Sequence, residues 1–396
     1  MSFQDLVNNP PEPERARRER SFPSGIVYDA GEAVEATLNL SNEIPEDEAG
    51  WRAAIQTVTG LALPEHREVV LTQVRYWGPP DDAAKYAYCR FTIRDRDMST
   101  SIDAIQVLHS LRKGKKARKS VASSGVEDAT AVLSWNDWQA GKAEGGGTLA
   151  LAERLDRQFD EFLDRIKDIP ARRRPKDLVI AGVGDMVEGC FIFPHQSFQI
   201  DGDRRTQIRN TVSLILEGLD RIAPSFERVR VGVVGGNHGQ NRVDGKKVNR
   251  HDNDDCAVFE HAALAASRDP LLQNVEFYIS QEEPALTLEV QGHILGMTHG
   301  DVFDRGGGAQ VEGKAYKWYS QQAAGHRAAG DANLLLTAHY HHHALADWGA
   351  CQWVQAPAND GGSGHFTDAS GRYADPGMLT WVMTPSERYL DPFILR

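Results

Sequence analysis

The sequence predicts an α/β fold, because strands and helices should alternate along most of the chain. From about residue 126 onward, short apolar runs of strand length alternate with longer amphipathic segments of helical period. Polar motifs rich in Asp, Asn, Gln and His directly follow five of these apolar runs. In layered α/β folds, ligand-binding groups gather beyond the carboxyl ends of strands. The positions of the motifs therefore agree with the predicted fold and indicate one common site.

Composition narrows the class of protein. The 396 residues suffice for two or three domains, and 41% hydrophobic and 25% charged residues are ordinary for a soluble globular chain. A net charge of −12 argues against nonspecific coating of nucleic acid, although metal ions and a local basic patch could still serve a nuclease. The four cysteines form no CxxC pair, and the N-terminus shows no signal-peptide core. With no apolar run of membrane-spanning length, we expect a cytoplasmic protein without a membrane partner.

The N-terminal part should hold a tail and a small domain. Residues 1–25 combine Pro, Glu and Arg with little periodicity, which predicts a mobile tail. Residues 26–111 are predicted to form a small α+β module. Its expected elements are a helix over Trp51–Gly60, strands over Val69–Tyr76 and Tyr86–Ile93, and a helix over Ser101–Leu111.

A basic segment should connect this module to the rest of the chain. Six of the eight residues in Arg112–Lys119 are basic, and a Ser/Gly-containing stretch follows, so residues 112–128 are predicted to be a linker. A solvated connector and a contact with a phosphate backbone are equally open interpretations of this charge.

Residues 129–396 are predicted to form the main domain. Candidate strands are Ala129–Ser134, Asp177–Val183, Arg228–Val234, Ala285–Val290, Ile294–Thr298 and Asn333–Thr337. Candidate helices are one whose apolar face carries Leu151, Leu155, Phe159, Phe162 and Ile166, followed by Gln207–Ala223 and Ala257–Ala266.

Five motifs carry the candidate chemistry. In chain order they are Asp137-Trp138-Gln139-Ala140-Gly141-Lys142, Gly184-Asp185-Met186-Val187-Glu188, Gly236-Asn237-His238-Gly239, Thr298-His299-Gly300-Asp301 and Ala338-His339-Tyr340-His341. This mixture of oxygen and imidazole donors suits a pair of divalent transition metals bridged by one carboxylate. Such a pair generates a hydroxide nucleophile and neutralises charge on a phosphoryl group.

Two histidine positions have a specific expected geometry. His339 and His341 are two residues apart, so on an extended backbone both should point to the same side. The same alternation turns His342 away. His238 directly follows Asn237 and would be left to act as a general acid for the departing oxygen of a phosphoester.

The ordered motifs resemble the calcineurin-like metallophosphoesterase superfamily, whose pattern runs D-x-H, G-D-x-x-[DE], G-N-H-[DE], H and G-H-x-H. The resemblance covers about residues 130–345. It implies a four-layer α-β-β-α sandwich and two divalent ions. The first ion would be held by Asp137, Gln139, Asp185 and His341, and the second by Asp185, Asn237, His299 and His339, with Asp185 bridging. His238 would stand over the substrate, oriented by Glu188.

Three positions depart from the family pattern. Gln139 replaces the usual His, Gly239 replaces an acidic residue, and Ala338 replaces a Gly. A carboxamide oxygen is a weaker and harder donor than imidazole, so we expect a looser first site. Mn²⁺ is then the favoured metal, with Mg²⁺, Zn²⁺ and Fe as alternatives.

These features predict a dinuclear-metal phosphodiesterase. The basic run Arg112–Lys119, the clusters Arg172-Arg173-Arg174 and Arg204-Arg205, and an N-terminal module that could present a strand favour a nuclease that cleaves DNA. The D-W-Q-x-G-K first motif and the added N-terminal module are similar to phosphoesterases of actinobacterial phages, and the chain resembles the DNA-repair exonuclease branch. A phage origin would place the protein in the host cytoplasm. A phosphomonoesterase or small-nucleotide hydrolase is the second interpretation, and a non-catalytic interaction scaffold is the third. The N-terminal module could serve a homo-oligomer or a protein partner.

Overall fold

A computed structural model describes residues 24–29, 32–41, 45, 48–64, 67–77, 86–95, 128–192, 196, 199–243, 246–303, 311–362 and 374–396. The chain divides into two compact units, residues 1–97 and 98–396. The expected helix Ser101–Leu111, the basic run Arg112–Lys119 and residues 1–23 lie outside the described residues. The finer division into tail, module and linker stays a prediction.

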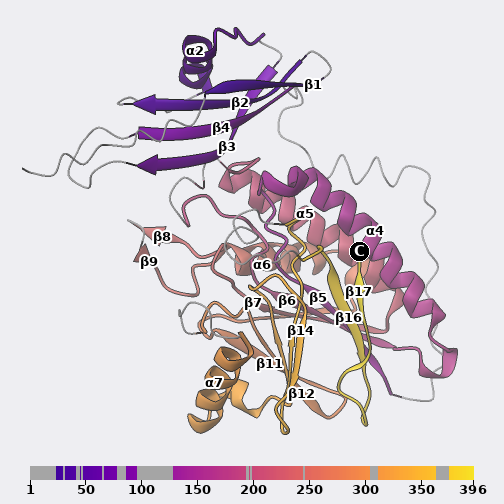
Figure 1. Ribbon diagram of the computed structural model, residues 1–396. Coiled ribbons are helices and arrows are strands. Elements are labelled where there is room, and N and C mark those ends of the chain that lie inside the picture. The colour runs from indigo at the N-terminus through magenta and orange to yellow at the C-terminus, as the bar shows by residue number, and fades with distance from the viewer. Residues whose placement is uncertain are drawn as a thin grey trace, which may run out of the picture. The chain divides into compact units, whose positions relative to one another are not determined.

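The described residues of the first unit form a four-stranded antiparallel sheet and a helix (Figure 1). The strands, in spatial order, are β1 (Gly25–Asp29), β2 (Glu32–Ser41), β4 (Tyr86–Asp95) and β3 (Arg67–Trp77), and the helix is α2 (Glu48–Thr59). Trp51 and Ile55 of α2 are buried, and the Trp51 ring lies 5.1 Å from that of Phe91 in β4. Aromatic packing between helix and sheet thus forms the core of this small α+β unit.

The second unit contains two larger sheets (Figure 1). In the first, the spatial order is β10 (Val275–Ile279), β7 (Arg228–Val234), β6 (Asp177–Val183), β5 (Thr130–Trp135), β16 (Met378–Met383) and β17 (Leu390–Leu395). The four strands from β10 to β5 are parallel, and β16 and β17 are antiparallel to their neighbours.

The second sheet has five strands. Its spatial order is β11 (Ala285–Val290), β12 (His293–Thr298), β13 (Leu334–Thr337), β15 (Gln352–Gln355) and β14 (Ala344–Asp347). The central strands β12, β13 and β15 are parallel. A separate two-stranded ribbon pairs β8 (Arg242–Val243) with β9 (Lys246–Lys247).

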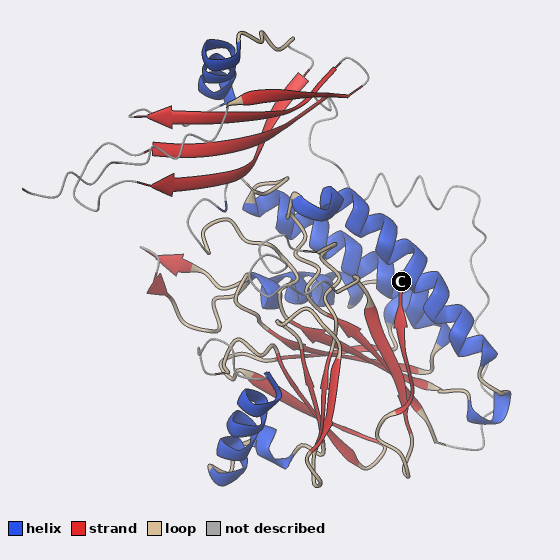
Figure 2. Ribbon diagram, in the orientation of Figure 1, coloured by secondary structure: helices blue, strands red, loops and turns tan. Residues whose placement is uncertain are grey.

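Helices cover the outer faces of both sheets (Figure 2). The α-helices among the described residues of this unit are α4 (Gly147–Asp168), α5 (Arg204–Ile222), α6 (Asp254–Ala266) and α7 (Val311–Ala324). Short 3₁₀ turns lie at Glu144–Gly146, Ala171–Arg173, Ala223–Ser225, Pro270–Leu272 and Ala328–Asp331. No helix among the described residues is long and apolar enough to cross a membrane.

Three buried clusters show that the unit has four layers. The first cluster packs α4, α5 and α6 on one sheet, the second fills the space between the sheets, and the third packs α7 on the other sheet. Strand β6 contributes to two of them, because Leu178 and Ile180 face the helices while Val179 and Ala181 face the second sheet. This alternation is the period of two expected for a strand buried on both faces. The predicted four-layer α-β-β-α sandwich is therefore confirmed.

The expected elements of the main domain are also confirmed. All six predicted strands are present, three of them with the predicted bounds, and the three predicted helices are present. The apolar face predicted for α4 is buried throughout. Not predicted were β1, β2, β8 to β10, β14 to β17 and α7. Several of these are edge or short strands in which polar residues interrupt the apolar pattern, as in Val275–Ile279.

Candidate metal centre

The candidate site lies where five parallel strands end. In the first sheet, β5, β6 and β7 are neighbours, and Asp137, Asp185 and Asn237 follow their last residues within three positions. In the second sheet, His299 and His339 follow the neighbouring strands β12 and β13 within two positions. Because neighbouring parallel strands end at the same edge, the topology brings these loops together.

The backbone of these loops is unusual. Eight non-glycine residues with positive φ occur among the described residues, and five of them are predicted ligands. The five are Asp137 (φ 46°), Gln139 (44°), Asp185 (52°), His339 (73°) and His341 (59°). Non-glycine residues in the left-handed region store strain and cluster at functional sites. The expectation of an extended His339-Tyr340-His341 segment is wrong. The backbone of both histidines has a positive φ, so the chain bends at this segment and does not run as a strand.

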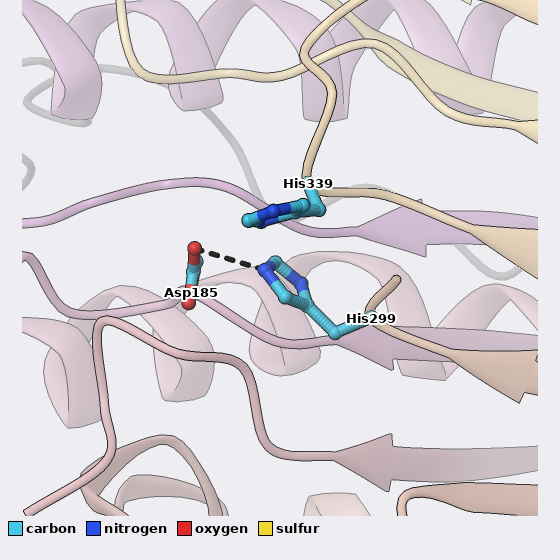
Figure 3. Close-up of side chains that lie close together, drawn as sticks. All are labelled: Asp185, His299 and His339. Carbon is cyan, nitrogen blue, oxygen red and sulfur yellow. Dashed lines mark ion pairs between the residues drawn. The ribbon is translucent and has the colours of Figure 1, made fainter. Parts of the chain in front are cut away.

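Three predicted ligands form a compact group (Figure 3). The carboxylate of Asp185 and the imidazoles of His299 and His339 offer ligand atoms that all lie within 4.8 Å of one another. The Asp185 Oδ2 and His299 Nε2 atoms are 2.9 Å apart. Two donors that share one ion at ~2.1 Å each are separated by about 3 Å, so this spacing suits a divalent cation.

Buried atoms that lack a hydrogen bond provide the test of fit. Among the described residues, Asp137 Oδ1 and Asn237 Oδ1 are buried without a hydrogen bond, and Asp185 Oδ2 and His299 Nε2 are buried with no hydrogen-bond partner beyond their own 2.9 Å contact. Each comes from a different one of the five motifs. Leaving such groups unpaired is costly unless a ligand satisfies them. The donor set fits a divalent cation held by carboxylate, carboxamide and imidazole groups.

Burial and the charges of neighbouring side chains shift the pKa values within the same group. Burial alone would raise the pKa of Asp185, but His299 and His238 outweigh it and lower that pKa. Burial would lower the pKa of His299, yet the Asp185 carboxylate raises it to about 10. Burial together with His299 lowers the pKa of His339 to about 4. His339 is therefore neutral at pH 7, the state in which an imidazole binds metal.

Hydrogen bonds orient the imidazole rings and carboxylates. His299 Nδ1 lies 2.7 Å from the Val183 carbonyl oxygen, which directs Nε2 toward Asp185. Asp137 Oδ2 accepts hydrogen bonds from Asn136 Nδ2 (2.8 Å) and from the His339 amide (3.3 Å). Its Oδ1 atom is thereby aimed at the site.

His341 and Gln139, two further predicted ligands, contact Asp137, Asp360 and Lys142. His341 Nε2 is 3.5 Å from Asp137 Oδ1, and His341 Nδ1 is 3.5 Å from Asp360 Oδ2. Burial lowers the pKa of His341, but Asp360 and Asp137 outweigh it and raise the value. The side-chain oxygen of Gln139 accepts a hydrogen bond from Lys142 Nζ at 3.3 Å. Asp360 and Lys142 at this end were not predicted from the sequence.

His238 and Glu188 are brought together as the resemblance implied. His238 Nδ1 lies 3.2 Å from Glu188 Oε2 and 2.9 Å from the Glu188 carbonyl oxygen. The His238 amide donates to Asp185 Oδ1 at 2.8 Å. Burial lowers the pKa of His238, but the charges of Asp185 and Glu188 outweigh it and raise the pKa to about 10. His238 therefore holds a proton at neutral pH.

Asp255 is a supporting residue that sequence reasoning missed. It lies in the first turn of α6 and is fully buried. Its Oδ2 accepts from the amides of Asp185 (2.8 Å) and Gly236 (2.9 Å), and its Oδ1 from those of Met186 (2.8 Å) and Val187 (3.2 Å). One carboxylate thus ties the loop after β6 to the loop after β7. The acidic start of α6 was the only sequence signal for it.

Two basic residues near the site were also missed. Arg250 Nη2 lies 3.3 Å and Lys247 Nζ 3.7 Å from Asp301 Oδ2, and Asp301 is two residues beyond His299. By contrast, two arginines from the clusters that favoured a DNA substrate, Arg174 and Arg204, make contacts within the fold. Arg174 donates to carbonyl oxygens at the end of α4, and Arg204 makes a bidentate ion pair with Asp254.

Comparisons with known proteins give structural likenesses only. No protein-family model and no curated protein matches this chain. An archaeal phosphodiesterase is 8% identical, with 67% of this chain and 99% of that chain covered and a TM-score of 0.31. Vps29 from Entamoeba histolytica, complexed with Zn²⁺, is 12% identical, with 67% and 99% covered and a TM-score of 0.31. Vacuolar protein sorting 29 from Cryptosporidium parvum is 14% identical, with 65% and 87% covered and a TM-score of 0.32.

Proposed function

We propose that the chain is a metal-dependent phosphodiesterase of the calcineurin-like metallophosphoesterase superfamily and that its substrate is DNA. The observation that carries this proposal is the group of ligand atoms of Asp185, His299 and His339 within 4.8 Å of one another, with the amide of His238 hydrogen-bonded to the same Asp185 carboxylate. Mn²⁺ is the favoured metal, because the donor set mixes carboxylate and carboxamide oxygens with imidazole.

Each predicted ligand has a role in this proposal. Asp185, Asn237, His299 and His339 would hold the ion of the second position, and Asp185 also borders the first position with Asp137, Gln139 and His341. A divalent ion held there would supply a water of lowered pKa and neutralise phosphoryl charge. The short contacts around Asp185 support its central role, since it touches both His299 and the His238 amide.

His238 supplies the proton for the leaving oxygen. The carboxylate of Glu188 and the negative charge of Asp185 keep the imidazole protonated, and Gln196 Nε2 holds Glu188 by hydrogen bonds to both Oε1 and the carbonyl oxygen (2.8 Å each). After donating its proton to the departing alkoxide, the neutral imidazole would be reprotonated from solvent through its partly exposed edge.

A DNA substrate needs positive potential that the net charge of −12 does not supply globally. Lys247 and Arg250 place two positive charges near the histidine ligands, where both form ion pairs with the single carboxylate of Asp301. This local excess of positive charge supports an anionic substrate. We also propose that the protein belongs to a phage-type or DNA-repair exonuclease group. The same proposal includes a cytoplasmic location and a partner for the N-terminal module.

The test is hydrolysis with and without metal. Pure protein with Mn²⁺ should cleave a chromogenic phosphodiester and linear DNA, both single- and double-stranded, and EDTA should stop both reactions. Cleavage of a phosphomonoester alone would favour the monoesterase interpretation. Absence of hydrolysis at every Mn²⁺ concentration, with metal bound, would favour the scaffold.

A further inference from the structure

Lys142 lies inside the first metal position. It follows Gln139 by three residues in a tight turn, where the Lys142 amide donates to the Gln139 carbonyl oxygen at 3.0 Å. The turn folds the side chain back, so that only 11% of it is exposed. Its Nζ atom donates to three oxygens: Asp360 Oδ2 (2.5 Å), the Gly362 carbonyl (2.8 Å) and Gln139 Oε1 (3.3 Å).

These three contacts use the full donor capacity of an ammonium group. Gln139 Oε1 is therefore oriented toward a cation that the chain itself supplies. A divalent ion bound to the same oxygen would lie within a few ångströms of the ammonium. Asp360 and Asp137 are almost fully buried here. Solvent would therefore screen the repulsion between the ammonium and a divalent ion poorly.

Charge balance at this position supports the same conclusion. Asp137 and Asp360 flank the ring of His341, with contacts of 3.5 Å to each ring nitrogen. Lys142 forms an ion pair with Asp360 and supplies the positive charge that a metal would otherwise contribute. In the second position the contacts of Asp185 are with His299 and the His238 amide instead.

We propose that the Lys142 ammonium takes the place of the first metal ion, so that the chain binds one divalent ion, at Asp185, Asn237, His299 and His339. A second ion binds only when the ammonium is displaced or removed. This inference rests on the proposed metal centre. It assigns the difference between the two positions to Lys142 and not to the weak donor strength of Gln139.

Calorimetric titration with Mn²⁺ of metal-stripped protein tests the inference, with circular dichroism to check folding. The wild type should bind one ion. Lys142→Gln, which removes the charge but can still donate to Asp360, should bind a second ion at least about tenfold more tightly than the wild type does. Lys167→Met is the matched control, because Lys167 pairs with Asp164 on the exposed face of α4. It should still bind one ion.

The outcomes separate the two proposals. Two ions of similar affinity in the wild type would overturn the role of Lys142 and leave the phosphodiesterase proposal standing, whatever the folding of the variants. One ion in both wild type and Lys142→Gln would also overturn it. If Gln139 were the cause, Gln139→His would gain the second ion and Lys142→Gln would not. Absence of binding in every variant would refute the metal centre itself.

Discussion

The two halves of the candidate centre differ, although the same strand ends build both. In the second position, Asp185, His299 and His339 converge, and Asp185 Oδ2 and His299 Nε2 contact each other at 2.9 Å. In the first position, the Gln139 oxygen is engaged by Lys142, and Asp360 adds a carboxylate. The strand ends therefore carry donors at both positions, and we propose that the local charge decides which position binds a metal.

This comparison separates what the fold contributes from what single residues contribute. Neighbouring parallel strands fix where the loops start, and Asp255 ties two of the loops together. Whether a position accepts an ion then depends on two side chains in one turn, Gln139 and Lys142. The predictions below test the two halves in order of expected effect.

The largest effect should come from Asp185, which contacts residues of both halves. Asp185→Asn should abolish hydrolysis and strongly reduce bound Mn²⁺, because the shared negative charge is lost. Metal analysis after gel filtration and the DNA cleavage assay measure both. Asp164→Asn, an exposed carboxylate on α4, is the control and should behave as wild type. Normal metal content and turnover in Asp185→Asn would show that the second position does not bind metal through Asp185.

His238 should affect the chemical step and spare metal binding. His238→Ala should keep its ion but lose roughly 10²–10⁴-fold in rate, the usual contribution of a positioned proton donor. The loss should shrink with phosphodiesters whose leaving group is already acidic. His261→Ala on the exposed side of α6 is the matched control. An equal loss with every leaving group would show that His238 is not the acid.

Asp255 should affect metal affinity through the loops it holds. In Asp255→Asn the amide nitrogen cannot accept, so at least one backbone N–H from Asp185 to Val187 or of Gly236 loses its partner. Supporting partners of this kind are worth roughly 10–100-fold in metal affinity. Titration with Mn²⁺ measures the change, and Asp252→Asn, at an exposed position just before α6, provides the control. Unchanged affinity would mean that the loops hold their positions without Asp255.

The smallest effect should be a pH shift caused by Glu188. Burial opposes protonation of His238, but Asp185 and Glu188 raise its pKa to about 10, so a general acid here stays active until alkaline pH. Glu188→Gln removes one of the two raising charges. The alkaline fall of kcat/KM should then move to lower pH by on the order of one unit. A pH profile of diester hydrolysis shows this, and an alkaline limb that stays in place would exclude Glu188 from that role.

The sequence predicted the residues that depend on strand ends. Asp137, Asp185, Asn237, His299 and His339 each follow an apolar run that proved to be a strand, so their shared edge could be deduced from topology. The strands β1 and β2 of the first unit were not predicted.

Residues that enter the site from elsewhere in the chain could not be predicted. Asp360 follows β15 and Asp255 lies in the first turn of α6, and neither belongs to a motif. Lys142 donates to Gln139 because a turn folds its side chain back, and hydrophobic periodicity does not predict the geometry of such a turn. The left-handed backbone at His339 and His341 likewise reflects tertiary constraint, which a pattern of spacing cannot show.

Crystals soaked in Mn²⁺ and measured at the manganese absorption edge would test the central claim most directly. The account predicts one strong anomalous peak coordinated by Asp185, Asn237, His299 and His339, with Lys142 Nζ still bound to Gln139 and Asp360. Two peaks of equal height, or a peak ligated by Gln139 with Lys142 turned away, would contradict the inequality of the two positions. Absence of any peak at the strand ends would contradict the metal centre.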